Sequence, residues 1–177
     1  MALVPLILLT AGAQATMPID PTDPSEPTRW LEVHDTVMGG RSHGTLRHED
    51  GHLVFAGHLS LANRGGFASV RTLPQPFPLA DHQGLTVRVR GDGRTYRLRL
   101  RDDERLDGPA WQFEFATVAD EWIQVTAPFS SFVATFRGRR VAVDGPLDPA
   151  RIRQLGFMVA DKQAGPFRLE IGAMGAY

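Results

Sequence analysis

The chain contains no cysteine, which excludes disulfides, thiol nucleophiles and thiolate metal sites. Lysine is also scarce: Lys162 is the only one among the nineteen basic residues, so the rest are arginine, which can contact a carboxylate through two parallel hydrogen bonds. Neither sign of charge dominates, because the net charge at pH 7 is −1. A balanced chain gives no reason to expect nucleic acid as a partner.

Helical periodicity is nearly absent after Trp30. Short apolar or alternating segments, separated by Gly, Pro and Asp, instead predict ten strands. We expect them at 31–35, 44–48, 52–61, 67–73, 84–90, 95–102, 111–117, 122–127, 154–160 and 167–173. This spacing predicts an all-β fold, a sandwich or barrel. Short helical turns are expected at 129–132 and at 149–153, the second capped by Asp148.

The N-terminal part divides into two expected segments before the folded domain. Residues 1–15 are expected to be a signal peptide, because residues 2–11 are apolar and Ala13-Gln14-Ala15 matches a cleavage site. The protein would then be exported or periplasmic; the alternative is a cytoplasmic protein that starts at Met17. The apolar stretch is too short for a membrane span. Residues 16–29 are expected to be a Pro-rich linker, and residues 30–177 a single β-sandwich domain.

Two glycine pairs, Gly39-Gly40 and Gly65-Gly66, stand at the edges of expected strands. Glycine permits a positive φ or a close backbone approach, so each pair predicts a shaped structural turn. Asp35 precedes the first pair, and its carboxylate is expected to accept hydrogen bonds from the N–H groups of residues 38–40. Arg41 follows, and either bonds to Asp35 or reaches a partner.

The turn at 91–94 is expected to close a hairpin whose strands alternate apolar residues with arginine. The apolar set should face the core: Leu85, Val87, Val89, Tyr96, Leu98 and Leu100. The arginines should then share one outer face: Arg88, Arg90, Arg97, Arg99 and Arg101.

This arginine face requires compensation, because like charges opposite one another across strands cost roughly 0.2 to 1 kcal/mol per pair. On the next expected strand Trp111, Phe113 and Phe115 continue the core pattern, which directs Gln112 and Glu114 toward the arginines. One interpretation is an exposed, salt-bridged sheet face. The other is a site on the concave face for an anion, a carboxylate-rich peptide or a sugar acid.

The sequence gives little support for a catalytic site or a cofactor site. The histidines near residues 43–58 lack the spacing of a metal site, so no metal or other cofactor is expected; a structural calcium bound by loop carbonyls remains an alternative. His34-Asp35 and Ser42-His43 contain the residue types of a hydrolytic triad, but neither segment has a Gly-x-Ser-x-Gly turn. We therefore expect a protein that is not an enzyme, with an uncharacterised hydrolase as the alternative.

Five segments occur in an order that resembles one family: DTVMGGRS, NRGGFASVR, RVRGDGR, PFSSFVATFRGR and ADKQAGPFRLEI. From about Trp30 to the C-terminus the chain is similar to the complex I intermediate-associated protein 30 family. The resemblance implies a jelly-roll β-sandwich of the galactose-binding-like type and an assembly-chaperone role, and it implies no reaction.

The resulting hypothesis is a noncatalytic binding module, protein-binding or chaperone-like, in the assembly of a respiratory or envelope complex. Its partner would be a protein, with subunits of complex I as the candidates. The alternative is a carbohydrate-binding β-sandwich, which needs exposed aromatic platforms; Trp111 and Trp122 fall on strand positions that predict core.

Overall fold

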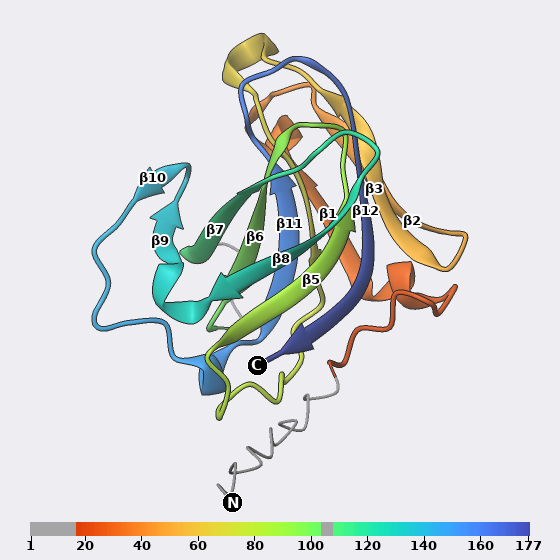
Figure 1. Cartoon of the computed structure of the whole chain (residues 1–177). Coiled ribbons are helices and arrows are strands. Elements are labelled where there is room, and N and C mark those ends of the chain that lie inside the picture. Colours follow the sequence, from red (N-terminus) through yellow and green to blue (C-terminus); the bar gives the residue numbers. More distant parts are fainter. Residues whose placement is uncertain (1–16, 104–107) are drawn as a thin grey trace, which may run out of the picture.

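A computed structural model describes residues 17–103 and 108–177, which form two antiparallel sheets (Figure 1). The first sheet contains, in spatial order, β1 (Trp30–His34), β4 (Ala68–Thr72), β11 (Gln154–Val159), β6 (Thr95–Arg101), β7 (Ala110–Ala116), β9 (Val133–Phe136) and β10 (Arg139–Arg140). The second contains β2 (His43–Glu49), β3 (His52–Leu59), β12 (Gly165–Ala176), β5 (Gly84–Arg90) and β8 (Trp122–Pro128). The all-β sandwich predicted from the sequence is confirmed.

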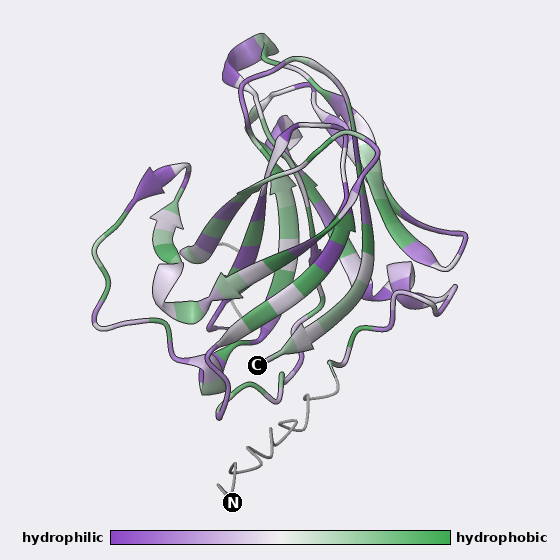
Figure 2. Ribbon diagram, viewed as in Figure 1, coloured by the Kyte–Doolittle hydropathy of each residue, from purple (hydrophilic) through white to green (hydrophobic). Residues whose placement is uncertain are grey.

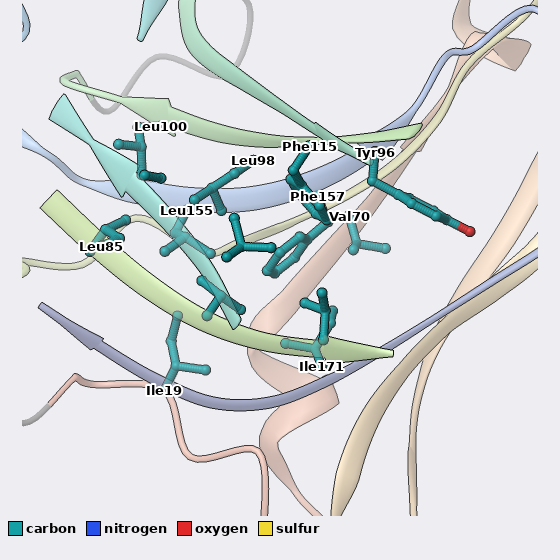
Figure 3. Close-up of a cluster of buried hydrophobic side chains, with 14 of the residues drawn as sticks. Ile19, Val70, Leu85, Tyr96, Leu98, Leu100, Phe115, Leu155, Phe157 and Ile171 are labelled. Atoms are coloured by element: carbon teal, nitrogen blue, oxygen red, sulfur yellow. The ribbon is translucent and has the colours of Figure 1, made fainter. Parts of the chain in front are cut away.

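The core lies between the sheets, because each strand directs alternate side chains inward. Strands β6 and β7 show this alternation as green and purple bands in Figure 2. The six residues expected to face the core are all buried, with Tyr96, Leu98 and Leu100 on one sheet and Leu85, Val87 and Val89 on the other. Figure 3 shows Leu98 and Phe157 packed in this layer.

The expected hairpin at 91–94 is not formed. β5 pairs with β12 and β8, whereas β6 pairs with β11 and β7, so the turn carries the chain from one sheet to the other. Arg94 holds this crossing: its side chain is buried, forms an ion pair with Asp161 at 3.0 Å and donates to the carbonyl of Pro166 at 3.1 Å. The two strands still share one core, but their outer faces point in opposite directions.

The expected Pro-rich linker is packed against the sandwich along residues 17–29. Met17 and Ile19 are buried in the core. Glu26 opens the short helix η1 (Glu26–Arg29); it is fully buried and accepts a hydrogen bond from Nε1 of Trp30 at 3.0 Å. Proline prevents an α-helix here but does not prevent apolar side chains from packing. The expected signal peptide, residues 1–15, lies outside the described residues.

Short helices occupy several connections: η2 (Asp35–Met38), η3 (Ala62–Arg64), η4 (Phe129–Ser131) and η5 (Pro149–Arg151). The two expected helical turns correspond to η4 and η5, and Asp148 caps η5 by accepting from the N–H of Ala150 at 3.0 Å. Strands β9 and β10, at one edge of the first sheet in Figure 1, were not predicted. Their short segments lack enough alternation to indicate strands.

Candidate functional site

Asp35 joins the two Gly-Gly segments. Its carboxylate is fully buried and accepts hydrogen bonds from the N–H of Ser42 at 2.9 Å, from the Ser42 hydroxyl at 2.6 Å, and from the N–H groups of Gly66 at 2.6 Å and Phe67 at 3.3 Å. The predicted hydrogen bonds from the N–H groups of residues 38–40 to this carboxylate are therefore wrong. The N–H of Gly40 donates instead to the main-chain oxygen of Asp35 at 2.9 Å, since η2 satisfies these groups within its own turn.

The four glycines of these segments fall into two pairs with different requirements. Gly39 and Gly66 have φ values of +86° and +133°, in the region that favours glycine. Gly40 and Gly65 instead lie directly against Asp35, so that a Cβ at either position would overlap its carboxylate. Both segments are thus shaped around one buried acid.

Hydrogen bonding keeps Asp35 ionised. Burial alone would raise the pKa of this carboxyl, but the bonds from Ser42, Gly66 and Phe67 outweigh it and lower the pKa below its ordinary value. A buried anion with four donors is a stable anchor for both loops.

These loops form one end of a groove of about 890 Å³ on the outer face of the seven-stranded sheet. We call it the arginine groove. Its floor comes from β4, β11, β6 and β7, and its far end from the β9–β10 turn. Seven cationic residues line it: Arg64, Arg71, Arg97, Arg99, Arg101, Arg137 and Lys162. Among the described lining residues there is no Asp or Glu, although the whole chain carries a net charge of −1.

Three of the predicted arginines, Arg97, Arg99 and Arg101, project from β6 into this groove. The expected neighbours are in place, since Glu114 lies opposite Arg97 and Gln112 opposite Arg99 in the register of β6 and β7. The ion pair of Arg97 is nevertheless weak. Glu114 is half exposed and its oxygen is 3.8 Å from Nε of Arg97, a separation at which an ion pair contributes little.

Arg71 belongs to the same cluster, although it is not among the site residues predicted from the sequence. The alternation along β4 provided a signal: buried Val70 faces the core, so Ser69 and Arg71 must face outward.

The cluster perturbs its own members. Burial, reinforced by the charges of Arg101, Arg71 and Arg97, lowers the pKa of Arg99 to about 10. Burial likewise lowers the pKa of Arg71. Burial therefore disfavours the charged forms of both arginines, and repulsion from the neighbouring arginines adds to this effect at Arg99.

The rim of the groove is apolar where the Gly-Gly loops form it. Val37 is 71% exposed, Met38 60% and Leu61 45%. Asn63 ties the two loops together by donating to the carbonyl of Gly39 at 3.1 Å. Arg41 is exposed; it does not line the groove, and no hydrogen bond or ion pair joins it to another residue in the described ranges.

Arg88 and Arg90 lie on the other side of the molecule, which contradicts the expected single arginine face. Their strand, β5, belongs to the five-stranded sheet. Both guanidinium groups lie over the ring of Trp122, at 5.0 and 5.3 Å from its centroid, and Arg90 pairs with Glu170 at 2.6 Å.

The prediction of Trp122 as core is also wrong, whereas Trp111 is buried as expected. Trp122 is the first residue of β8 and points outward, since the next inward positions on this strand are Ile123 and Val125. Its ring is partly covered by the two arginines and by His52, whose ring centroid is 4.8 Å away.

The residue types of a hydrolytic triad do not assemble. The Ser42 hydroxyl donates directly to Asp35 and is fully buried. His34 accepts at Nδ1 from the N–H of Ser69 at 3.2 Å, so Nε2 carries the proton and donates to the carbonyl of Gly44 at 2.8 Å. With both ring nitrogens committed to the backbone, His34 is unavailable as a base for Ser42.

Among residues 17–103 and 108–177, no three His, Asp or Glu side chains converge as metal ligands. No helix in the same ranges is long and apolar enough to span a membrane.

Comparisons with known proteins place these features in a family context. The sequence model described as Complex I intermediate-associated protein 30 matches residues 19–171. The mouse (Mus musculus) protein named "Complex I intermediate-associated protein 30, mitochondrial" is 32% identical over 84% of this chain, and the Drosophila melanogaster protein of that name is 27% identical over 96%. The chain spans 52% of the mouse protein and 65% of the fly protein.

Solved structures with the same fold include carbohydrate-binding modules. The family 11 module of a cellulosomal cellulase from Clostridium thermocellum superposes with a TM-score of 0.68 over 94% of this chain and 95% of that one, at 15% identity. The same family's module in complex with a mixed-linked tetrasaccharide gives a TM-score of 0.63 at 16% identity, over 89% and 94% of the two chains. Identities this low establish the fold alone. The superpositions confirm the predicted galactose-binding-like jelly roll.

The predicted localisation is wrong. Export, or a cytoplasmic protein starting at Met17, was expected from the N-terminal residues, but the relatives in mouse, fly and Caenorhabditis elegans are named as mitochondrial proteins. An apolar N-terminal stretch with small residues proved insufficient to indicate a signal peptide.

Proposed function

The chain belongs to the complex I intermediate-associated protein 30 family, and on that premise we propose that it is a noncatalytic module that binds a polypeptide partner during assembly of complex I. We propose that the partner is a subunit of complex I. This identity is a proposal because the chain covers only part of the length of its relatives. The observation that carries it is the arginine groove with its apolar rim.

The groove has the composition of a protein-binding surface. Interface centres are enriched in arginine, methionine and aromatic residues, whereas lysine and the acidic residues are depleted. Here Val37, Met38 and Leu61 expose apolar area beside a floor that contains four arginines. An exposed apolar patch next to a cluster of like charges is costly for an isolated domain, and a partner would cover both.

Carbohydrate binding is the second candidate, favoured by the fold shared with the family 11 module. A sugar site requires an open aromatic face for stacking. The described residues lining the groove include two aromatic side chains, Phe67 and Phe136, and no tryptophan. On the opposite sheet, Arg88, Arg90 and His52 pack against the ring of Trp122 and leave it only partly exposed. These contacts favour the polypeptide.

The test is affinity capture of the tagged protein from its own cells, with complex I subunits quantified by mass spectrometry. Wild type is compared with the Arg97→Gln/Arg99→Gln double variant and with Arg88→Gln on the opposite sheet. We expect wild type and Arg88→Gln to recover complex I subunits and the double variant to lose them. Equal recovery by all three, or specific binding on a glycan array without subunits, would refute the proposal.

A further inference from the structure

Arg71, Gly156 and Arg99 form one row across three neighbouring strands of the groove floor. Gly156 of β11 lies opposite Arg71 of β4 on one side and opposite Arg99 of β6 on the other. Strands are about 4.8 Å apart, so the two arginines start about 10 Å from each other with no side chain between them. The result is a hollow with a guanidinium group on each side.

The packing keeps this central position empty. A Cβ at Gly156 would overlap the carbonyl oxygen of Val70 and lie 2.9 Å from Cβ of Arg71. The row continues to Gln112 of β7, which is neutral, so Arg99 has no carboxylate opposite it in the register.

The hydrogen bonds of this row are incomplete. Nε of Arg71 and Nε of Arg99 are both buried and find no partner among the described residues. Within the described part of the chain, the one acceptor at the other end of Arg99 is the sulfur of Met158, 3.6 Å from Nη1, and sulfur is a weak acceptor. Leaving a buried donor without an acceptor destabilises the protein, and more so when the donor is charged. Two such donors beside one hollow indicate that an acceptor is missing from it.

We propose that Arg71 and Arg99 together bind a carboxylate side chain of the partner polypeptide above Gly156. This inference rests on the proposed function, because it identifies the chemistry of the partner's contact. Each guanidinium can present two parallel N–H groups to a carboxylate, and charge-assisted bonds of this type are stronger than neutral ones.

The surroundings select a polypeptide over a small oxoanion. The groove, at about 890 Å³, is far larger than a single phosphate or carboxylate, and its Gly-Gly rim is apolar through Val37, Met38 and Leu61. A segment in which an acidic residue stands between large apolar residues would fill both parts. We therefore expect acidic-apolar segments to bind and purely acidic or purely apolar ones to bind poorly.

The test uses two synthetic ten-residue peptides, one of alternating Leu and Glu and one of alternating Leu and Gln. Side-chain Nε–Hε signals of the ¹⁵N-labelled protein are followed by NMR and assigned with Arg71→Lys and Arg99→Lys. We expect the Leu/Glu peptide to shift both signals and the Leu/Gln peptide to leave them in place. Arg71→Gln and Arg99→Gln should each weaken Leu/Glu binding about 10- to 100-fold, and the control Arg88→Gln should not.

Several results would overturn the inference. One is equal binding of the two peptides. Another is binding of the Leu/Glu peptide without a shift of the Arg71 and Arg99 signals. The third is a shift of these signals by inorganic phosphate at a lower concentration than the peptide requires. The wild-type titration requires no variant, so a variant that fails to fold does not remove the test. If complex I subunits are captured but the signals stay silent, only this inference fails; if the signals respond but no subunit is captured, the proposed function fails.

Discussion

The carboxylate of Asp35 accepts a hydrogen bond from the N–H of Gly66, 31 residues further along the chain, at 2.6 Å. This bond fixes the second Gly-Gly loop to the first, and the two loops together carry the apolar rim of the arginine groove. Disturbing one buried acid should therefore affect both the stability of the domain and the shape of the groove.

Replacing Asp35 by Asn should lower the free energy of unfolding by about 2–3 kcal/mol. The amide would point an NH₂ group at donors that now face an oxygen, and it would remove the charge that strengthens these bonds. Urea unfolding at pH 7 measures the loss. Asp148→Asn is the matched control: its exposed carboxylate accepts one backbone N–H, from Ala150, so its loss should be about 1 kcal/mol or less. Similar losses would contradict the anchoring role.

The contribution of Asp35 should depend on pH in one direction. Its folded-state pKa is lowered, because hydrogen bonds from Ser42, Gly66 and Phe67 outweigh the opposing effect of burial. Such a group stabilises the fold above its unfolded pKa of about 3.9 and loses that contribution as the pH falls through its folded pKa. The advantage of wild type over Asp35→Asn should stay constant from pH 7 to about 5 and shrink below about pH 4. Urea unfolding at successive pH values measures it, and an advantage that grows on acidification would contradict this sign.

Gly65→Ala should destabilise the protein through steric overlap. The added Cβ would meet the carboxylate of Asp35 and lie 2.9 Å from the carbonyl oxygen of Ala62, and overpacking of this kind costs about 1–3 kcal/mol. It would also push Asp35 away from its donors. Gly138→Ala is the control, because Gly138 has a φ of +76° but open space around it, so only backbone strain of about 1 kcal/mol applies. Equal unfolding midpoints in urea would refute the steric explanation.

The local hydrophobic pattern predicted the two layers of this fold better than it predicted which strands pair with each other. Alternation on the two strands beside Gly91 correctly placed Val89 and Tyr96 in the core. Alternation says which side of a strand is buried, but it does not say which sheet the strand joins. The chain crosses between the sheets at this turn, where Arg94 forms an ion pair with Asp161. Because β5 and β6 therefore belong to different sheets, the expected five-arginine face separates into two.

Long-range contacts account for the rest of the site. Arg71 joins Arg99 only because β11 lies between their strands, and no spacing along the chain encodes that neighbour. The partners of Asp35 were likewise expected within its own turn, yet Gly66 and Phe67 come from the second glycine segment. The sequence indicated which residues were candidates for the site, whereas the sheet topology determines which of these residues lie next to one another.

Arg99→Met should make the free protein more stable while weakening partner binding. Arg99 is held among three other arginines, and burial together with their charges lowers its pKa to about 10. Replacing a poorly compensated buried charge by an apolar side chain of similar length is neutral to stabilising, here by about 1 kcal/mol.

The measurement for Arg99→Met is urea unfolding at low and high NaCl. Salt screens the repulsion among the arginines, so the gain over wild type should diminish as NaCl is added. Arg88→Met, on the other sheet, is the control and should show no gain, since Arg88 lies against Trp122. A folded Arg99→Met variant that is less stable than wild type at low salt would show that the arginine cluster is not strained.

The apolar rim should contribute to partner binding without contributing to folding. Val37 and Met38 are 71% and 60% exposed, so the Val37→Ser/Met38→Ser variant should change the free energy of unfolding by only about 0.5 kcal/mol. Burying these side chains against a partner would be worth about 1.5–3 kcal/mol each, so capture of complex I subunits should fall at least tenfold. Val118→Ser is the matched control: Val118 is 51% exposed and does not line the groove. If the control variant lost the subunits equally, the binding surface would lie elsewhere on the sandwich.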